Sequence, residues 1–201
     1  MIVKFFVKSP TVSLKNYTIK DVPGSSGRLD VVARCILATL LGRDGFEENV
    51  EIWIFLDKYG TFIFNPNSFV YETFPKNELK LSDYFVDFLF KLNGNGMKRK
   101  ALNFNPLSSI QISDMNFLSA LRKFQKMEYS IFTLKEEGTD FFQIMSNLQK
   151  KERLLFIIGS QVDEFFNSKE LSVLNIPSIS IGTQSYLASS VIRLLKLHIL
   201  S

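Results

Sequence analysis

Three charged residues beside a glycine-rich turn are the best candidates for chemistry in this chain. Arg28, Asp30 and Arg34 follow the turn Pro23–Gly27 and lie at the start of a predominantly apolar stretch. A helix start exposes backbone N–H groups and favours anionic ligands, and residues four apart lie on one helix face. The cluster could bind an anion or move a proton. It could equally be a surface ion pair at a helix start that is capped by a serine of the turn.

Glycines also follow three predicted strands. Gly138, Gly159 and Gly182 each lie in the loop after an apolar, β-branched stretch. Ligands of parallel α/β sheets bind beyond the carboxyl ends of the strands, and glycine lets the backbone approach a ligand closely. We therefore expect these three loops to line one pocket.

Hydrophobic periodicity supplies the elements that would position these residues. Strands are predicted at Ile2–Val7, Val50–Leu56, Thr61–Phe64, Tyr129–Leu134, Leu154–Ile158 and Ser178–Ile181. Helices are predicted at Leu29–Leu41, Leu81–Leu92, Asp114–Lys126, Asp140–Lys150, Ser168–Leu174 and Gln184–Leu200. This alternation favours an α/β domain with a largely parallel sheet.

The composition limits the possible chemistry. With one cysteine and one histidine, we expect no metal site, no internal disulfide and no histidine-based triad. Cys35 has apolar neighbours and is predicted to be a buried thiol, and His198 a residue at the edge of the core. Trp53 and most of the 20 phenylalanines are also assigned to the core.

The bulk properties are those of a globular protein. The chain has 201 residues, of which 46% are hydrophobic and 22% charged, and its net charge of +4 permits a nucleic-acid partner. No apolar run has the length of a membrane span, and the start is too short for a secretory signal. We therefore expect a cytoplasmic protein without a membrane partner.

A basic segment interrupts the middle of the chain. Lys98, Arg99 and Lys100 follow two glycines in the stretch Asn93–Met97. Such a segment is either a solvated loop or an RNA-binding loop that contacts phosphates.

Four blocks of sequence resemble one known family. Pro23–Asp30 resembles the N-terminal signature of the archaeal TrmY family, the tRNA pseudouridine N1-methyltransferases of the SPOUT superfamily. Phe132–Asp140, Phe156–Gly159 and Ile179–Ser190 resemble the loops that bind the cofactor in that family. The blocks occur in the family's order and span nearly the whole chain.

The resemblance implies a fold, a cofactor and partners. The expected fold is a single SPOUT domain over 1–201, with a mostly parallel sheet, helices on both faces and a deep C-terminal trefoil knot. The knotted, cofactor-binding region would span about 129–201. S-adenosylmethionine would be the cofactor, tRNA the substrate, and the active form a homodimer.

The resemblance also assigns residues to the cofactor pocket. By matching positions, the expected S-adenosylmethionine-binding residues are Leu134, Gly159, Ile181, Gly182, Thr183, Gln184, Ser185, Tyr186 and Val191. Such a pocket offers the adenine apolar walls and backbone hydrogen bonds.

The methyl transfer that the resemblance implies needs few side chains. N1 of pseudouridine must lose a proton and be aligned with the methyl group. A carboxylate can orient or accept that proton, and an arginine can stabilise the anionic ring. Asp30 is thus expected at the nucleobase. Arg28 would orient Asp30 or hold a phosphate, and Arg34 is the third candidate.

The chain also departs from the family pattern. Gly159 precedes Ser160–Gln161, where the family carries an Asp-His pair, and the middle region around Pro75–Glu78 differs as well. Three further functions therefore stay open. They are methylation of another RNA such as ribosomal RNA, RNA binding by an inactive SPOUT protein, and small-molecule binding by an unrelated α/β domain.

Overall fold

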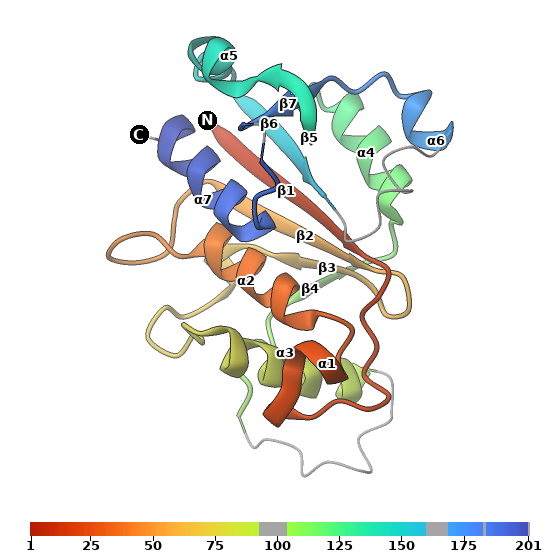
Figure 1. The fold of residues 1–201 in the computed structure, drawn as a ribbon. Helices are drawn as coiled ribbons and strands as arrows, with labels where there is room; N and C mark the ends of the chain where they lie inside the picture. The colour runs from red at the N-terminus through yellow and green to blue at the C-terminus, as the bar shows by residue number, and fades with distance from the viewer. Residues whose placement is uncertain (93–103, 160–168, 183, 201) are drawn as a thin grey trace.

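The chain folds around one twisted sheet with helices packed on it (Figure 1). The structure is a computed structural model that describes residues 1–92, 104–159, 169–182 and 184–200. In these residues the sheet has seven strands in the order β4-β3-β2-β1-β6-β5-β7. Their bounds are β1 Ile2–Ser9, β2 Val50–Leu56, β3 Gly60–Phe64, β4 Gln111–Ser113, β5 Ser130–Asp140, β6 Arg153–Ile158 and β7 Ser178–Ser180.

The sheet is mostly parallel, as predicted. Strand β1 pairs in parallel with β2 and β6, and β5 pairs in parallel with β6 and β7. Only β3 and β4 extend the sheet with antiparallel pairs. Strands β1, β2 and β6 at the centre are buried over most of their length because helices cover both faces of the sheet.

Helices cover both faces of the sheet. The described helices are α1 Val22–Ser25, α2 Leu29–Leu40, α3 Glu78–Leu92, α4 Phe117–Lys126, α5 Phe141–Leu148, α6 Lys169–Ser172 and α7 Ala188–Ile199. Neighbouring residues of β1 point to opposite sides. Phe5 belongs to the core under α2, α3 and α7, whereas Phe6 belongs to the core under α4. In Figure 1, α2 and α7 accordingly lie side by side, with α4 across the sheet.

Aromatic rings fill the second core, which includes Trp53, and most of the described phenylalanines belong to one of the two cores, as predicted. The ring of Phe6 lies 5.5 Å from that of Trp53 and 4.9 Å from that of Phe55. Phe104 and Phe142 are exceptions, with 63% and 47% of their surface exposed. None of the helices in the described ranges is long and apolar enough to cross a membrane.

Several element boundaries differ from the predictions for local reasons. Helix α4 starts at Phe117, three residues late, because the side chain of Asn116 caps it by accepting from the Ser119 amide at 2.9 Å. Strand β5 continues to Asp140, whose carboxylate then caps α5. Helix α7 begins only at Ala188. The predictions missed β4, which has three residues at the edge of the sheet.

Candidate active site

A cavity of about 680 Å³ lies at the carboxyl ends of β5, β6 and β7, beside the start of α2. Its volume is in the range typical of small-molecule sites. The lining residues are Arg28, Val31, Leu134, Lys135, Glu136, Glu137, Ile158, Gly159, Ile179, Ser180, Ile181, Gly182, Gln184, Ser185, Tyr186, Leu187, Ala188 and Val191. Apolar side chains from the strand ends and α7 thus form the wall, and charged side chains come from β5 and from Arg28.

The cavity brings together most of the residues that were expected to bind the cofactor. Those that line it are Leu134, Gly159, Ile181, Gly182, Gln184, Ser185, Tyr186 and Val191. Thr183 lies outside the described residues. The three loops after the predicted strands therefore meet at one place, although two of their glycines, Gly159 and Gly182, rather than three line the cavity.

The loop after β7 needs a glycine at position 182. Gly182 has a backbone φ of +155°, which residues with a side chain rarely adopt. A Cβ at this position would lie 3.2 Å from the Tyr186 hydroxyl. The Ser180 hydroxyl closes the turn, since it donates to the Gly182 carbonyl at 2.9 Å and accepts from the Gly182 amide at 3.2 Å. Tyr186 therefore folds back over exposed backbone at the cavity wall.

An irregularity in β5 places charged residues at the cavity. Leu134 and Thr139 both pair with Ile179, so residues 135–138 bulge out of the ladder. A Cβ on Gly138 would overlap the backbone of Ile179, and only glycine fits where the chain returns to the sheet. This bulge explains why Lys135, Glu136 and Glu137 line the cavity although they belong to a strand.

The charged cluster at the start of α2 is built around Asp30. Its Oδ1 accepts from Arg28 Nε at 3.1 Å, and its Oδ2 accepts from Arg28 Nη2 at 3.3 Å and from Arg34 Nη2 at 2.6 Å. The side chain of Asp30 is 6% exposed, whereas those of Arg28 and Arg34 are 48% and 31% exposed. Arg34 also contacts Glu78 of α3 at 3.3 Å.

The backbone just before the cluster has an unusual conformation. Gly27 and Arg28 have φ values of 62° and 72°, and the second is unusual for a residue with a side chain. A Cβ on Gly27 would overlap the Thr11 carbonyl, and the Ser13 amide donates to the Ser26 carbonyl at 2.9 Å. The segment before α2 is thus held tightly, and backbone strain of this kind often accompanies functional sites.

This geometry favours a division of roles that differs from the expected one. Both oxygens of Asp30 already accept from guanidinium groups, and the carboxylate is buried. Arg28 is half exposed and lines the cavity. Arg28 is therefore placed to contact a ligand, and Asp30 to hold Arg28. The cluster also fits the other interpretation, an ion pair at a helix start. A serine of the turn helps to cap this start, as that interpretation expects, because Ser26 Oγ accepts from the Leu29 amide at 3.0 Å.

The other candidates lie away from the cavity or outside the described residues. Lys98, Arg99 and Lys100 are not described. Cys35 is fully buried in α2, and burial raises the pKa of its thiol to about 12. His198 packs against Phe142 near the other end of α7. Among the described residues, no group of His, Cys, Asp and Glu could hold a metal ion.

The predictions missed several lining residues. Val31 lies one turn of α2 after Arg28, and this spacing could have indicated it. Leu187 and Ala188 were placed inside a predicted helix, whereas the structure puts them at its start. The loop after Leu134 was expected at the pocket, and Lys135, Glu136 and Glu137 do line it, but as part of a bulged strand rather than of a loop.

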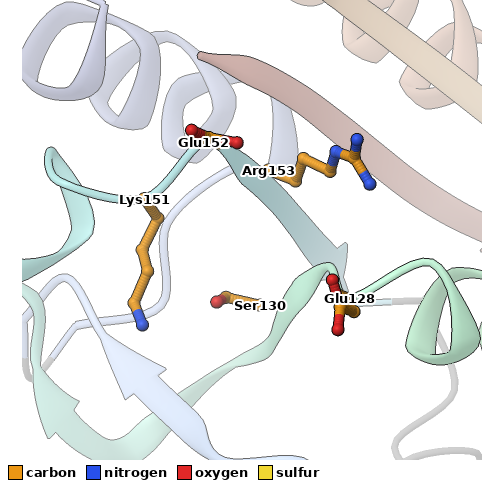
Figure 2. Close-up of a pocket in the computed structure, with 5 residues that line it drawn as sticks. All are labelled: Glu128, Ser130, Lys151, Glu152 and Arg153. Carbon is orange, nitrogen blue, oxygen red and sulfur yellow. The ribbon is translucent and has the colours of Figure 1, made fainter.

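A second hollow of about 230 Å³ lies at the amino ends of β5 and β6 (Figure 2). Four of its five lining residues are charged, namely Glu128, Lys151, Glu152 and Arg153, and the fifth is Ser130. Figure 2 shows these five side chains around the hollow. It lacks the apolar surface that small-molecule sites usually provide.

The fold and the cavity define an α/β protein with a cavity at the carboxyl ends of parallel strands, where such folds usually bind their ligands. A family model described as "Putative SAM-dependent RNA methyltransferase" matches residues 2–201, and the chain belongs to this family. The family resemblance inferred from the four sequence blocks is thereby confirmed.

Curated relatives from archaea match over nearly the whole chain. A protein from Pyrococcus abyssi is 25% identical over 203 residues, which cover 97% of this chain and 96% of the relative. A protein from Thermococcus onnurineus is 26% identical over 197 residues, which cover 94% and 92%. Both are named tRNA (pseudouridine(54)-N(1))-methyltransferase.

A solved structure shares the fold. The crystal structure of Archaeoglobus fulgidus Nep1 bound to S-adenosylhomocysteine aligns with a TM-score of 0.60 and 18% identity. The alignment covers 99% of this chain and 97% of the Nep1 chain. The overall fold of the chain is therefore shared with a solved protein.

Proposed function

We propose that this protein transfers a methyl group from S-adenosylmethionine to N1 of pseudouridine 54 in tRNA. One observation carries the proposal: a single cavity joins the loops expected to bind the cofactor to Arg28, the half-exposed cation at the start of α2. The names of the full-length archaeal relatives support the same reaction.

The cavity suits the proposed cofactor. Its volume of about 680 Å³ can accept a nucleoside with an amino-acid tail, and Leu134, Ile181 and Val191 offer an apolar surface for the adenine. At Gly159 the backbone can approach the ligand without a side chain of its own in between, and at Gly182 the ring of Tyr186 lies against the backbone. When bound, S-adenosylmethionine supplies an electrophilic methyl group.

The residues of the chain would prepare the nucleobase. Arg28 would stabilise the negative charge that develops on the ring when N1 loses its proton, or would hold an adjacent phosphate. Asp30 would keep the guanidinium of Arg28 at the cavity, and Arg34 would hold Asp30 from the other side. Alignment of N1 with the methyl group supplies most of the remaining rate.

We further propose the finer features that the family resemblance implies. These are a single SPOUT domain over 1–201, a knotted cofactor-binding region at about 129–201, and a homodimer that acts in the cytoplasm. Two apolar side chains of α7 and its start, Leu187 and Leu197, are exposed, and a second copy of the chain could cover them in the proposed homodimer.

Methylation of two tRNA transcripts tests the function. One carries pseudouridine at position 54 and the other uridine, and both are incubated with the protein and labelled S-adenosylmethionine. We expect label only in the first transcript. Label in ribosomal RNA but in neither transcript would assign another RNA, which the sequence after Gly159 motivates. Absence of cofactor binding would favour the inactive RNA-binding protein.

A further inference from the structure

A buried lysine fastens the two helices that form one side of the cavity. Lys196 of α7 is 7% exposed, and its Nζ donates to the backbone carbonyls of Ala38 at 3.0 Å, Thr39 at 2.8 Å and Leu41 at 3.0 Å. Glu47, in the loop after α2, lies 3.4 Å from the same ammonium. The three N–H donors of the ammonium thus have three carbonyl partners and a nearby counter-charge.

These contacts complete the C-terminal end of α2. A helix leaves its last four carbonyls without partners inside the helix. Here the Leu37 carbonyl accepts from the Leu41 amide and the Leu40 carbonyl accepts from the Glu47 amide. The carbonyls of Ala38 and Thr39 are left, and Lys196 satisfies both. A residue about 160 positions away in the sequence therefore caps α2.

Both helices extend from the cavity to this lysine. At the start of α2, Arg28 and Val31 line the cavity, and at the start of α7, Ala188 and Val191 line it. Lys196 joins the opposite ends of the same two helices. Lys196 thus adds a polar attachment at the far ends of two helices that also pack on each other in the core.

We propose that Lys196 is a positioning residue for the cofactor cavity, which holds the start of α7 in register with the Arg28 end of α2. This inference rests on the proposed function only in taking S-adenosylmethionine as the ligand. Burial lowers the pKa of Lys196, and the nearby Glu47 opposes that shift. Lys196 lies between the buried residues Ile192 and Ile199. Burial of its charge costs free energy, which the hydrogen bonds to the carbonyls and the nearby Glu47 must offset.

The test compares two variants that destabilise different parts of the protein. K196M removes the ammonium and keeps an apolar stem, whereas L121A creates a cavity under α4, on the opposite face of the sheet. The dissociation constant of S-adenosylhomocysteine is measured by calorimetry at a temperature well below both thermal midpoints. We expect binding to weaken at least about tenfold in K196M and to stay within about twofold in L121A.

Hydrogen exchange without ligand gives a second measurement. In K196M we expect faster exchange at the amides of Val191 and Ile192, near the start of α7, whereas L121A should leave them unchanged. If K196M does not fold, K196Q, which keeps an amide donor, takes its place in both measurements. Unchanged affinity and exchange in a folded Lys196 variant would overturn the inference. A wild-type protein that does not bind S-adenosylhomocysteine would instead overturn the proposed function.

Discussion

The two ends of α2 carry opposite arrangements of charge. At its start, the buried carboxylate of Asp30 lies between two partly exposed arginines, one of which lines the cavity. At its end, the buried ammonium of Lys196 is surrounded by carbonyls and Glu47. Both arrangements agree with the helix dipole, which favours an anion at the start and a cation at the end.

The difference separates a site from a structural attachment. At the start of the helix, the carboxylate oxygens of Asp30 accept hydrogen bonds from the arginines, while about half of the Arg28 side chain stays exposed and available to a ligand. At the end, Lys196 is 7% exposed and directs its hydrogen bonds to backbone carbonyls. Substitutions at the start should therefore affect turnover more than stability, and substitutions at the end should do the reverse.

The largest effect is expected at Arg28. In R28A the cavity loses the cation that would stabilise the anionic ring, and turnover should fall about a thousandfold. Cofactor affinity should change little, because apolar side chains and backbone form most of the cavity. Methyl incorporation into the pseudouridine transcript and calorimetry with S-adenosylhomocysteine measure the two quantities. R43A is the matched control, since Arg43 is 95% exposed and lies at the far end of α2. Near-normal turnover in R28A would refute the assigned role.

The next effect concerns stability at the other end of the helix. K196M leaves the carbonyls of Ala38 and Thr39 without their donor and Glu47 without its cation. We expect the free energy of unfolding to fall by about 3 kcal/mol, because two backbone carbonyls at the end of α2 lose their hydrogen-bond donor. Urea denaturation measures the change, with K151M as an exposed-lysine control. A loss below about 1 kcal/mol would mean that water satisfies the end of α2.

A smaller effect distinguishes the two roles considered for Asp30. If Asp30 acts by holding Arg28, D30N should lower turnover about tenfold to a hundredfold, and the double variant R28A/D30N should be no slower than R28A. If Asp30 instead takes the N1 proton, the two losses should add. The measurement is single-turnover methylation of the pseudouridine transcript by the four proteins, with their folding checked by circular dichroism.

The sequence predicted the features that depend on local pattern. Apolar strands and the rule for parallel sheets were enough to place Gly159 and Gly182 at one cavity. Pattern alone could not show that β5 bulges at residues 135–138, because the pairing with Ile179 is a long-range contact. It also could not show that Asp30 is buried between two arginines. Lys196 was the one available signal for the helix attachment, since it interrupts the apolar stripe of α7.

The smallest effect lies between the two ends of α2, at Cys35. Burial raises the pKa of this thiol from 9.0 to about 12, so between these values the unfolded chain loses a proton that the folded protein keeps. Stability attributable to Cys35 is therefore full below pH 9 and falls as the pH rises. From pH 8 to pH 10 the wild type should lose about 1 kcal/mol more than C35A, as measured by urea denaturation at both pH values. The same pH dependence in both proteins would contradict this prediction. It would mean that water reaches the thiol and that the middle of α2 is less well packed than the buried Cys35 indicates.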